Sequence, residues 1–248
     1  MVTFSLGRVR ALHLDPPTTL ARARKAQPWI LPTALAVFGV LAIGAAMDAL
    51  PWDEPITRWV IDARTPWADR LFRRVSFLGS TPVVLGVAAV AAAAAWRRCP
   101  RLAMAIVVIA LARPLAEWTL KELIDRPRPA GDRMVDGTGP SFPSGHPLAT
   151  AASWGLLPLV AGLYVKRRWV WWSIAVGVWV LAVLVAASRV WLAVHWTSDV
   201  VAALALAVLG VAGAERVIAA THGPCRSASS ELLDAEDVDA QVVDRPVL

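Results

Sequence analysis

Residues 169–187 read WVWWSIAVGVWVLAVLVAA, a run of nineteen residues without a charged side chain. A helix of about 20 apolar residues crosses the hydrocarbon core of a bilayer, which is roughly 30 Å thick. Hydrophobic residues make up 57% of the 248 residues, too many for a soluble domain with a polar surface. Comparable apolar stretches lie at Trp29–Leu50, Phe77–Trp96, Leu102–Leu123, Pro147–Val165 and His195–Ala220. The sequence therefore predicts an all-α integral membrane protein, a bundle of six transmembrane helices.

The segments outside these stretches divide the chain into three parts. Residues 1–27 are predicted to form a basic cytoplasmic tail and residues 28–222 the six-helix membrane domain. Residues 223–248 are acidic and poor in aromatic residues, a composition that does not fold alone, so we expect a disordered cytoplasmic tail. Between the first two spans, residues 51–74 form a loop of mixed charge, with an amphipathic stretch around 56–61 that suits an interfacial helix.

The basic residues predict the orientation of the bundle. The formal net charge is +6, but the lysines and arginines flank spans and do not gather in a polar domain, which argues against a nucleic-acid partner. Six spans put both termini on one side, together with the basic loops at residues 97–101 and 166–168. By the positive-inside rule that side is the cytoplasm of a plasma-membrane protein.

Three polar clusters then fall at the extracytoplasmic ends of the spans. They are Lys121 with Arg126 and Arg128, the run Pro143-Ser144-Gly145-His146, and the set Ser188, Arg189, His195 and Asp199. Ionisable residues at span ends are costly unless they are paired or solvated, so their convergence on one side indicates a functional site.

His195 and Asp199 stand four residues apart at the start of the last span, on one helical face. A carboxylate that accepts from the imidazole Nδ1 hydrogen would leave Nε2 free to attack phosphorus. An isolated pair with this spacing is equally typical of a structural hydrogen bond.

The second cluster precedes a helix that begins at Pro147. Ser144, Gly145 and His146 could offer a hydroxyl and backbone N–H groups to an anion at a helix N-terminus, and His146 could donate a proton to a leaving oxygen. Taken alone, the four residues would more often form an ordinary capped turn.

Several cations complete the pattern. Lys121, Arg128 and Arg189 supply the positive charge that a phosphate dianion requires. The alternative for each is an interfacial residue that extends towards water, and this alternative is favoured for Arg126 and Arg133. Arg113 and Glu117, four apart inside the third span, are predicted to form a structural ion pair.

Together these residues resemble the three-part signature of the type 2 phosphatidic acid phosphatase superfamily. Lys121 is followed after six residues by Arg128-Pro129, then by Pro143-Ser144-Gly145-His146, then by Ser188-Arg189, five residues, His195, three residues and Asp199. The resemblance covers the third to the sixth span. Ala193 departs from it, since many members have glycine there.

The resemblance implies a membrane lipid phosphatase without a metal or other cofactor. His195 would attack phosphorus, Asp199 would orient His195, and His146 would act as the acid and then as the base. The phosphate-binding residues would be Lys121, Arg128, Ser144, Gly145 and Arg189. The expected substrates are polyprenyl diphosphate, phosphatidic acid, phosphatidylglycerol phosphate or another polyprenyl phosphate, among which the sequence does not choose.

Two alternatives stay open at this point. A phosphotransferase would use the same histidine with an acceptor other than water. A non-catalytic membrane protein that binds lipid phosphates would need no histidine chemistry, and the complete set of residues speaks against it.

Overall fold

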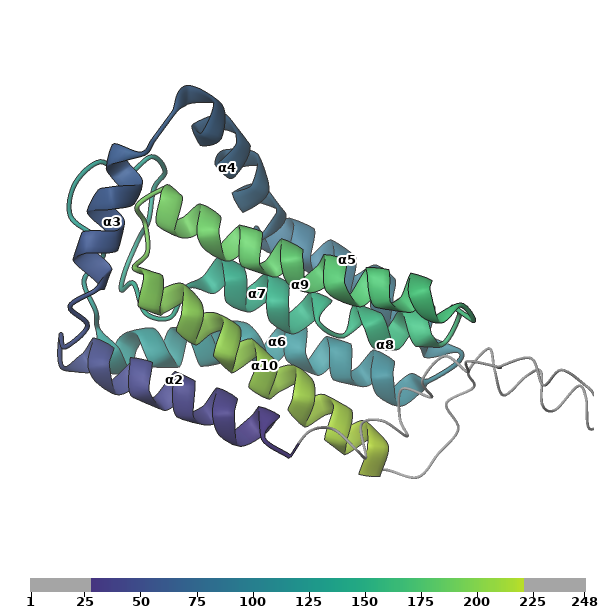
Figure 1. The fold of residues 1–248 in the computed structure, drawn as a ribbon. Coiled ribbons are helices and arrows are strands. Elements are labelled where there is room, and N and C mark those ends of the chain that lie inside the picture. Colours follow the sequence, from purple (N-terminus) through teal and green to yellow (C-terminus); the bar gives the residue numbers. More distant parts are fainter. Residues whose placement is uncertain (1–27, 221–248) are drawn as a thin grey trace, which may run out of the picture.

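The computed structural model describes residues 28–220, in which all regular elements are helices and no strand occurs (Figure 1). The predicted tails at 1–27 and 223–248 lie outside the described residues. The helices are α2 (Ile30–Ala46), α3 (Asp53–Asp62), α4 (Pro66–Leu78), α5 (Thr81–Trp96), α6 (Pro100–Ile124), α7 (Gly145–Trp154), α8 (Leu157–Gly162), α9 (Arg168–Trp191) and α10 (Thr197–Ala220).

Helix α7 lies at the centre of the bundle. Every residue from Pro147 to Trp154 is buried, and the helix packs against α5, α6, α9 and α10. Its small side chains, among them Ala149, Ala151 and Ala152, let the surrounding helices approach closely, as is usual for helices packed in a membrane. The same device joins α5 to α6, where buried alanines of both helices meet. The helix that follows the Ser144-Gly145-His146 motif is thus held from four sides.

The lengths and composition of the helices support a membrane protein, but they do not confirm the predicted count of six spans. Within residues 28–220, α6, α9 and α10 are long and apolar enough to cross a bilayer, and α4 with α5 form a further candidate bent by 46°. Helix α2 is apolar but shorter, with 17 residues. The predicted fourth span is broken into α7 and α8 next to Gly155, and Pro158 in the first turn of α8 lacks a backbone N–H.

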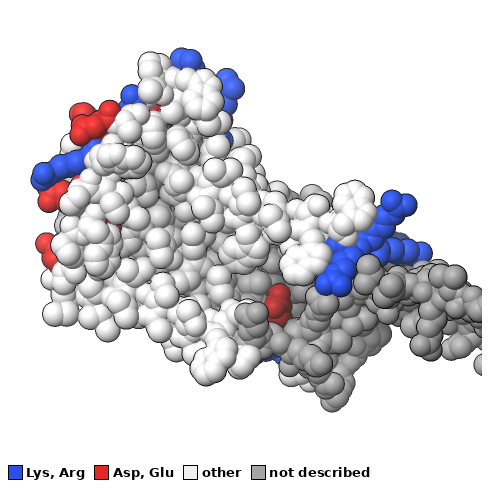
Figure 2. Space-filling view, viewed as in Figure 1, with Lys and Arg blue, Asp and Glu red and all other residues white. Residues whose placement is uncertain are grey.

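The outer surface explains why the composition is so apolar. Side chains such as Val90, Leu111 and Val176 are more than half exposed, which water would penalise and lipid does not. Figure 2 shows Lys, Arg, Asp and Glu concentrated at the two ends of the visible face, with a broad band of other residues between them.

The segment predicted as a loop at residues 51–74 contains two helices. Helix α3 covers the predicted amphipathic stretch, and α4 begins where the Thr65 hydroxyl accepts from the N–H of Ala68 and Pro66 opens the first turn. Both helices pack against α9, and α3 also contacts α10 (Figure 1). They therefore cover the end of the bundle where α9 ends and α10 begins.

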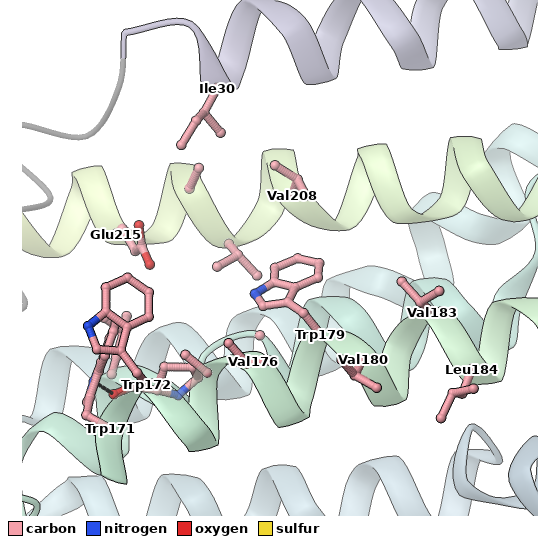
Figure 3. A pocket seen from close by; sticks show the side chains of 16 residues that line it. Ile30, Trp171, Trp172, Val176, Trp179, Val180, Val183, Leu184, Val208 and Glu215 are labelled. Atoms are coloured by element: carbon pink, nitrogen blue, oxygen red, sulfur yellow. Dashed lines mark hydrogen bonds between the residues drawn. The ribbon is translucent and has the colours of Figure 1, made fainter. Parts of the chain in front are cut away.

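An apolar groove opens between α9 and α10, which diverge away from that end (Figures 1 and 3). It has a volume of about 730 Å³ and is lined by Trp171, Trp172, Trp179 and aliphatic side chains, with Glu215 as its charged residue. Such a lining suits hydrocarbon and offers no cation to a phosphate. The chemistry indicated by the sequence must therefore lie in a different cavity.

Candidate active site

A polar cavity of about 240 Å³ lies between the C-terminal part of α6, the start of α7 and the segment that joins α9 to α10. It brings together most of the residues singled out in the sequence. The predicted residues that line it are Lys121, Arg128, Gly145, His146, Arg189 and His195. The two histidines, separated by 49 residues of sequence, thus face one pocket.

His195 lies in the short connection between α9 and α10 and is 3% exposed. Its Nδ1 lies 2.8 Å from the carbonyl oxygen of Ser141, which can only accept a hydrogen bond, so we assign the ring hydrogen to Nδ1. Nε2 then carries the lone pair, and Nη1 of Arg128 donates to it over 3.2 Å. Nε2, which carries no hydrogen, therefore lies next to a residue that lines the cavity.

The surroundings of His195 keep its ring uncharged. Burial, opposed by Asp199 and reinforced by the positive charges of Arg128 and Arg189, lowers the pKa of His195 to about 4. The imidazole is therefore neutral at pH 7, the form that can act as a nucleophile.

Asp199 contacts His195, but less closely than the sequence suggested. Its Oδ2 lies 3.5 Å from Nδ1 and accepts from the N–H of Trp196 at 2.9 Å. The nearer partner of Nδ1 is the carbonyl oxygen of Ser141, which no motif in the sequence had indicated. Asp199 is fully buried and stands behind the ring, outside the cavity lining.

His146 lies in the first turn of α7, immediately before the predicted fourth span. Burial lowers its pKa to about 3, and the charges of Arg189, His195, Arg113 and Lys121 act in the same direction. His146 is therefore neutral in the empty cavity.

The N-terminus of α7 presents the second motif to the cavity. Gly145 and His146 line the cavity, whereas Ser144, at the N-cap position, is fully buried and outside the lining. Its side chain makes no capping hydrogen bond, and its Oγ has no hydrogen-bond partner among the described residues. Gly145 is tightly placed, because a Cβ added there would lie 2.2 Å from Oε1 of Glu117.

Glu117 links two cations on α6. Its Oε2 accepts from Arg113 at 2.8 Å and its Oε1 from Lys121 at 2.8 Å, and all three residues line the cavity. The predicted pair between Arg113 and Glu117 is confirmed. The sequence did not indicate that this pair belongs to the site, since its spacing is equally typical of a pair in the bundle interior.

Arg128 and Arg189 are held in different ways. Arg128 donates to the backbone carbonyls of Val194, Thr138 and Gly139, which tie the segment after α6 to His195. Arg189 donates to Oγ of Ser76 at 2.7 Å, and its buried Nε has no partner within residues 28–220. Arg189 thus keeps an unused donor, whereas Nε, Nη1 and Nη2 of Arg128 all have acceptors, so Arg128 offers an anion in the cavity chiefly its positive charge.

The prediction that Arg126 lies at the lipid–water interface is wrong. Arg126 is 4% exposed and forms ion pairs with Asp199 at 2.7 Å and with Asp53 at 2.8 Å. Arg133 is exposed, in agreement with its interpretation as a surface residue. The difference arises because the carboxylate of Asp53, 73 residues away, is brought to Arg126 by tertiary folding.

Comparison with known proteins supports the resemblance seen in the motifs. Residues 101–221 match the family model of the PAP2 superfamily. Phosphatidylglycerophosphatase B of Bacillus subtilis (strain 168) is 30% identical over 167 residues, which cover 63% of this chain and 78% of that protein.

The fold agrees with two solved structures. The crystal structure of the first transmembrane PAP2 type phosphatidylglycerolphosphate phosphatase from Bacillus subtilis superposes with a TM-score of 0.66 and 25% identity, covering 76% of this chain and 96% of that one. LpxE of Aquifex aeolicus gives a TM-score of 0.53 at 19% identity, over 67% and 95% of the two chains. The signature, the family model and the 30% identical relative agree, and the chain therefore belongs to the PAP2 superfamily as a membrane phosphatase of that type.

Proposed function

We propose that this protein is a lipid phosphate phosphatase that hydrolyses a phosphomonoester or diphosphate of a lipid or polyprenyl carrier, releasing one phosphate through a phosphohistidine at His195. The observation that carries this proposal is the direction of Nε2 of His195, which faces the cavity and the cation Arg128, while Nδ1 is engaged by a backbone carbonyl. A neutral imidazole with an unprotonated Nε2 next to fixed cations can attack phosphorus once its lone pair leaves the hydrogen bond to Arg128.

The proposed reaction has two steps. In the first, Nε2 of His195 forms a bond to phosphorus, the bond between phosphorus and the lipid oxygen breaks, and protonated His146 gives its proton to that oxygen. In the second, His146 takes a proton from water, the water oxygen attacks phosphorus, and the P–N bond breaks. The products are the lipid alcohol, or a lipid monophosphate from a diphosphate, and inorganic phosphate.

The acid role of His146 requires the substrate. Its pKa is lowered in the empty cavity by burial and by Arg189 and other cations, so the empty site leaves it neutral. A bound phosphate dianion supplies opposite charge beside the ring and favours the protonated form. In our proposal His146 therefore takes up its proton together with the substrate.

The charge of the cavity supports phosphoryl transfer by electrostatic stabilisation alone. The lining contains the cations Arg113, Lys121, Arg128 and Arg189. It also contains Glu117, which forms ion pairs with the first two. Phosphoryl transfer depends chiefly on positioning and on charge around the equatorial oxygens, which fixed guanidinium and ammonium groups provide. We propose a metal-independent mechanism on this ground, in which Ser144 and Gly145 hold the phosphate together with Lys121, Arg128 and Arg189.

We further propose that the domain comprises residues 28–222 and crosses the plasma membrane six times. The crossings would be α2, the segment Phe77–Trp96 with α5, α6, the segment Pro147–Val165 with α8, α9 and α10. This places both termini in the cytoplasm and the cavity at the extracytoplasmic face, in agreement with the basic loops at residues 97–101 and 166–168. The relatives' names favour phosphatidylglycerol phosphate among the candidate substrates.

The decisive experiment is an assay of phosphate release by the purified protein in detergent. A panel would contain phosphatidylglycerol phosphate, phosphatidic acid and polyprenyl mono- and diphosphates, each with EDTA present and absent. We expect release that EDTA does not reduce and that His195→Ala abolishes, together with an acid-labile phosphoenzyme from ³²P-labelled substrate. Dependence of release on an added alcohol acceptor would instead identify a phosphotransferase, and no release from any substrate would contradict catalysis.

A further inference from the structure

A buried cluster of charged residues lies behind His195. Its members Asp53, Arg126 and Asp199 are 2%, 4% and 0% exposed, and none of them lines the 240 Å³ cavity. Buried charges are rare in proteins unless they are paired, and those at a catalytic histidine affect its chemistry. Asp53 and Arg126 lie outside the signature residues to which roles were assigned above.

The cluster joins three segments that are far apart in sequence. Arg126 follows α6, Asp53 begins α3, and Asp199 lies in the first turn of α10. Nη1 of Arg126 donates to Oδ1 of Asp199 and to Oγ of Ser198, both at 2.7 Å, and Nη2 donates to Oδ2 of Asp53 at 2.8 Å. Asp53 also accepts from the N–H and the hydroxyl of Ser198, so the carboxylate is fixed at the start of α10.

This arrangement leaves Asp199 no freedom to rotate. One oxygen is engaged by Arg126 at 2.7 Å and the other by the N–H of Trp196 at 2.9 Å. The second oxygen is also the one that faces Nδ1 of His195 at 3.5 Å. The position of the carboxylate behind the imidazole is thus set by Arg126, and the position of Arg126 is set in turn by Asp53.

The charges of the cluster do not cancel. Two carboxylates and one guanidinium leave a net charge of −1 beside the edge of the ring that carries Nδ1. When Nε2 binds phosphorus and Nδ1 keeps its hydrogen, the ring becomes a cation, and a net negative charge on that side stabilises it.

We propose that Asp53 and Arg126 are positioning residues for His195, which together hold Asp199 in place and leave one uncompensated negative charge behind the imidazole. This inference rests on the proposed phosphohistidine route and adds to it the two residues that set the charge on the far side of the ring. The charged or titratable groups that face His195 from other elements are Arg128, Arg189 and His146, and the tests below leave them unchanged.

The test is a charge-compensation series in the full-length protein in detergent. Arg126→Met leaves two carboxylates and a net charge of −2, and should raise the pKa of His195 by roughly half a unit to one unit. The double variant Asp53→Asn/Arg126→Met returns the net charge to −1, and should bring the titration back towards that of the wild type. The pKa is followed by NMR of protein labelled with ¹³C-histidine, with the signal assigned by its loss in His195→Asn.

Glu54→Gln is the matched control, because Glu54 is the next residue of α3 and its side chain is 64% exposed. We expect it to leave the titration and turnover unchanged. In both Arg126 variants kcat should fall about tenfold or more with little change in KM, since Asp199 is no longer fixed. If Arg126 served in packing alone, Arg126→Met would lower the stability of the protein without raising the pKa of His195.

Three outcomes would overturn the proposal: an unchanged titration in Arg126→Met, a double variant that does not return towards the wild type, or wild-type kcat in either variant. If Arg126→Met does not fold, the double variant decides by its kcat, because it leaves one buried carboxylate, Asp199, without its ion pair where Arg126→Met leaves two. A wild-type protein that forms no phosphoenzyme would refute the proposed function, whereas the titrations would still test the cluster.

Discussion

The carboxylate of Glu117 occupies the position where a side chain on Gly145 would begin. An ideal Cβ on Gly145 would lie 2.2 Å from Oε1 and 2.7 Å from Oε2 of Glu117. Glu117 is held there by Arg113 and Lys121, each at 2.8 Å. This contact couples the C-terminal half of α6 to the first residue of α7, and it gives a physical reason for glycine at this position of the signature.

Gly145→Ala should lower kcat/KM by about tenfold or more, because the new methyl group displaces Glu117 and with it the cavity-lining cations Arg113 and Lys121. The double variant Gly145→Ala/Glu117→Ala removes the clash and should be less impaired than the product of the two single effects predicts. Gly86→Ala is the control, since nothing lies within 4 Å of a Cβ there. Independent effects of the two substitutions would refute the steric explanation.

Glu117→Gln should tighten the binding of inorganic phosphate by several-fold, because the cavity loses a negative charge beside Arg113 and Lys121. The measurement is the inhibition constant of phosphate, with vanadate as a second anion. Glu122→Gln removes a charge from an exposed residue of the same helix and should have no effect. Weaker inhibition in Glu117→Gln would indicate that Glu117 serves mainly to hold the cations in place.

His146→Ala should slow turnover by a factor on the order of 10² if it protonates the leaving oxygen. An aryl phosphate has a leaving group of low pKa that needs no proton. With this substrate, His146→Ala should slow the first step far less. Burst kinetics separate the two steps of the reaction. Equal losses for both substrates in the first step would argue against an acid role.

Stability should fall as the pH decreases from about 6.5 towards 4. The pKa of His195 is lowered to about 4 and that of His146 to about 3, chiefly by burial, from 6.5 for an ordinary histidine. Below pH 6.5 these histidines bind protons in the unfolded chain but stay neutral in the folded protein. Their contribution to the free energy of unfolding is therefore fully present above pH 6.5 and is lost as the pH falls.

We therefore expect the Tm in detergent to be a few degrees lower at pH 5 than at pH 7. The double variant His146→Gln/His195→Gln lacks both groups and should show a smaller difference. An equal decrease in the variant would mean that other groups cause the loss of stability.

Ala193→Gly should raise the free energy of unfolding by up to about 1 kcal/mol. Ala193 has φ +53°, a left-handed conformation that glycine adopts without the steric cost of a Cβ. The Tm of purified protein reports the change. Position 193 is the place where the resemblance leads one to expect glycine, and a lower Tm in Ala193→Gly would show that the neighbouring contacts of the methyl group outweigh its backbone strain.

Much of the fold followed from composition and periodicity. Long apolar stretches predict α6, α9 and α10 because a membrane helix satisfies its own backbone, so its length is visible in the sequence. The break between α7 and α8 was not predicted, since both halves are apolar, although Gly155 and Pro158 are a local signal for it. Helix α4 was missed because its mixed charge also suits a loop, although Thr65 and Pro66 give a recognisable helix start.

The residues of the candidate site were likewise predicted only in part from the sequence. The motifs indicated His146, His195 and their cations because each stands at a fixed short spacing within one segment, and the structure gathers these residues at one cavity. Arg126 was assigned to the wrong environment, and Asp53 and Ser141 were not considered at all. Their roles depend on partners more than 50 residues away.

The sequence by itself determined the membrane class, the helical fold and most of the charged and titratable groups that line the polar cavity, because these depend on local hydrophobicity and on residues close together in the chain. Only the tertiary structure decided which acceptor holds Nδ1 of His195, which cation neutralises Asp199 and why Gly145 has no side chain. Each of these is a contact between remote segments, and its distance and burial arise only when the helices pack.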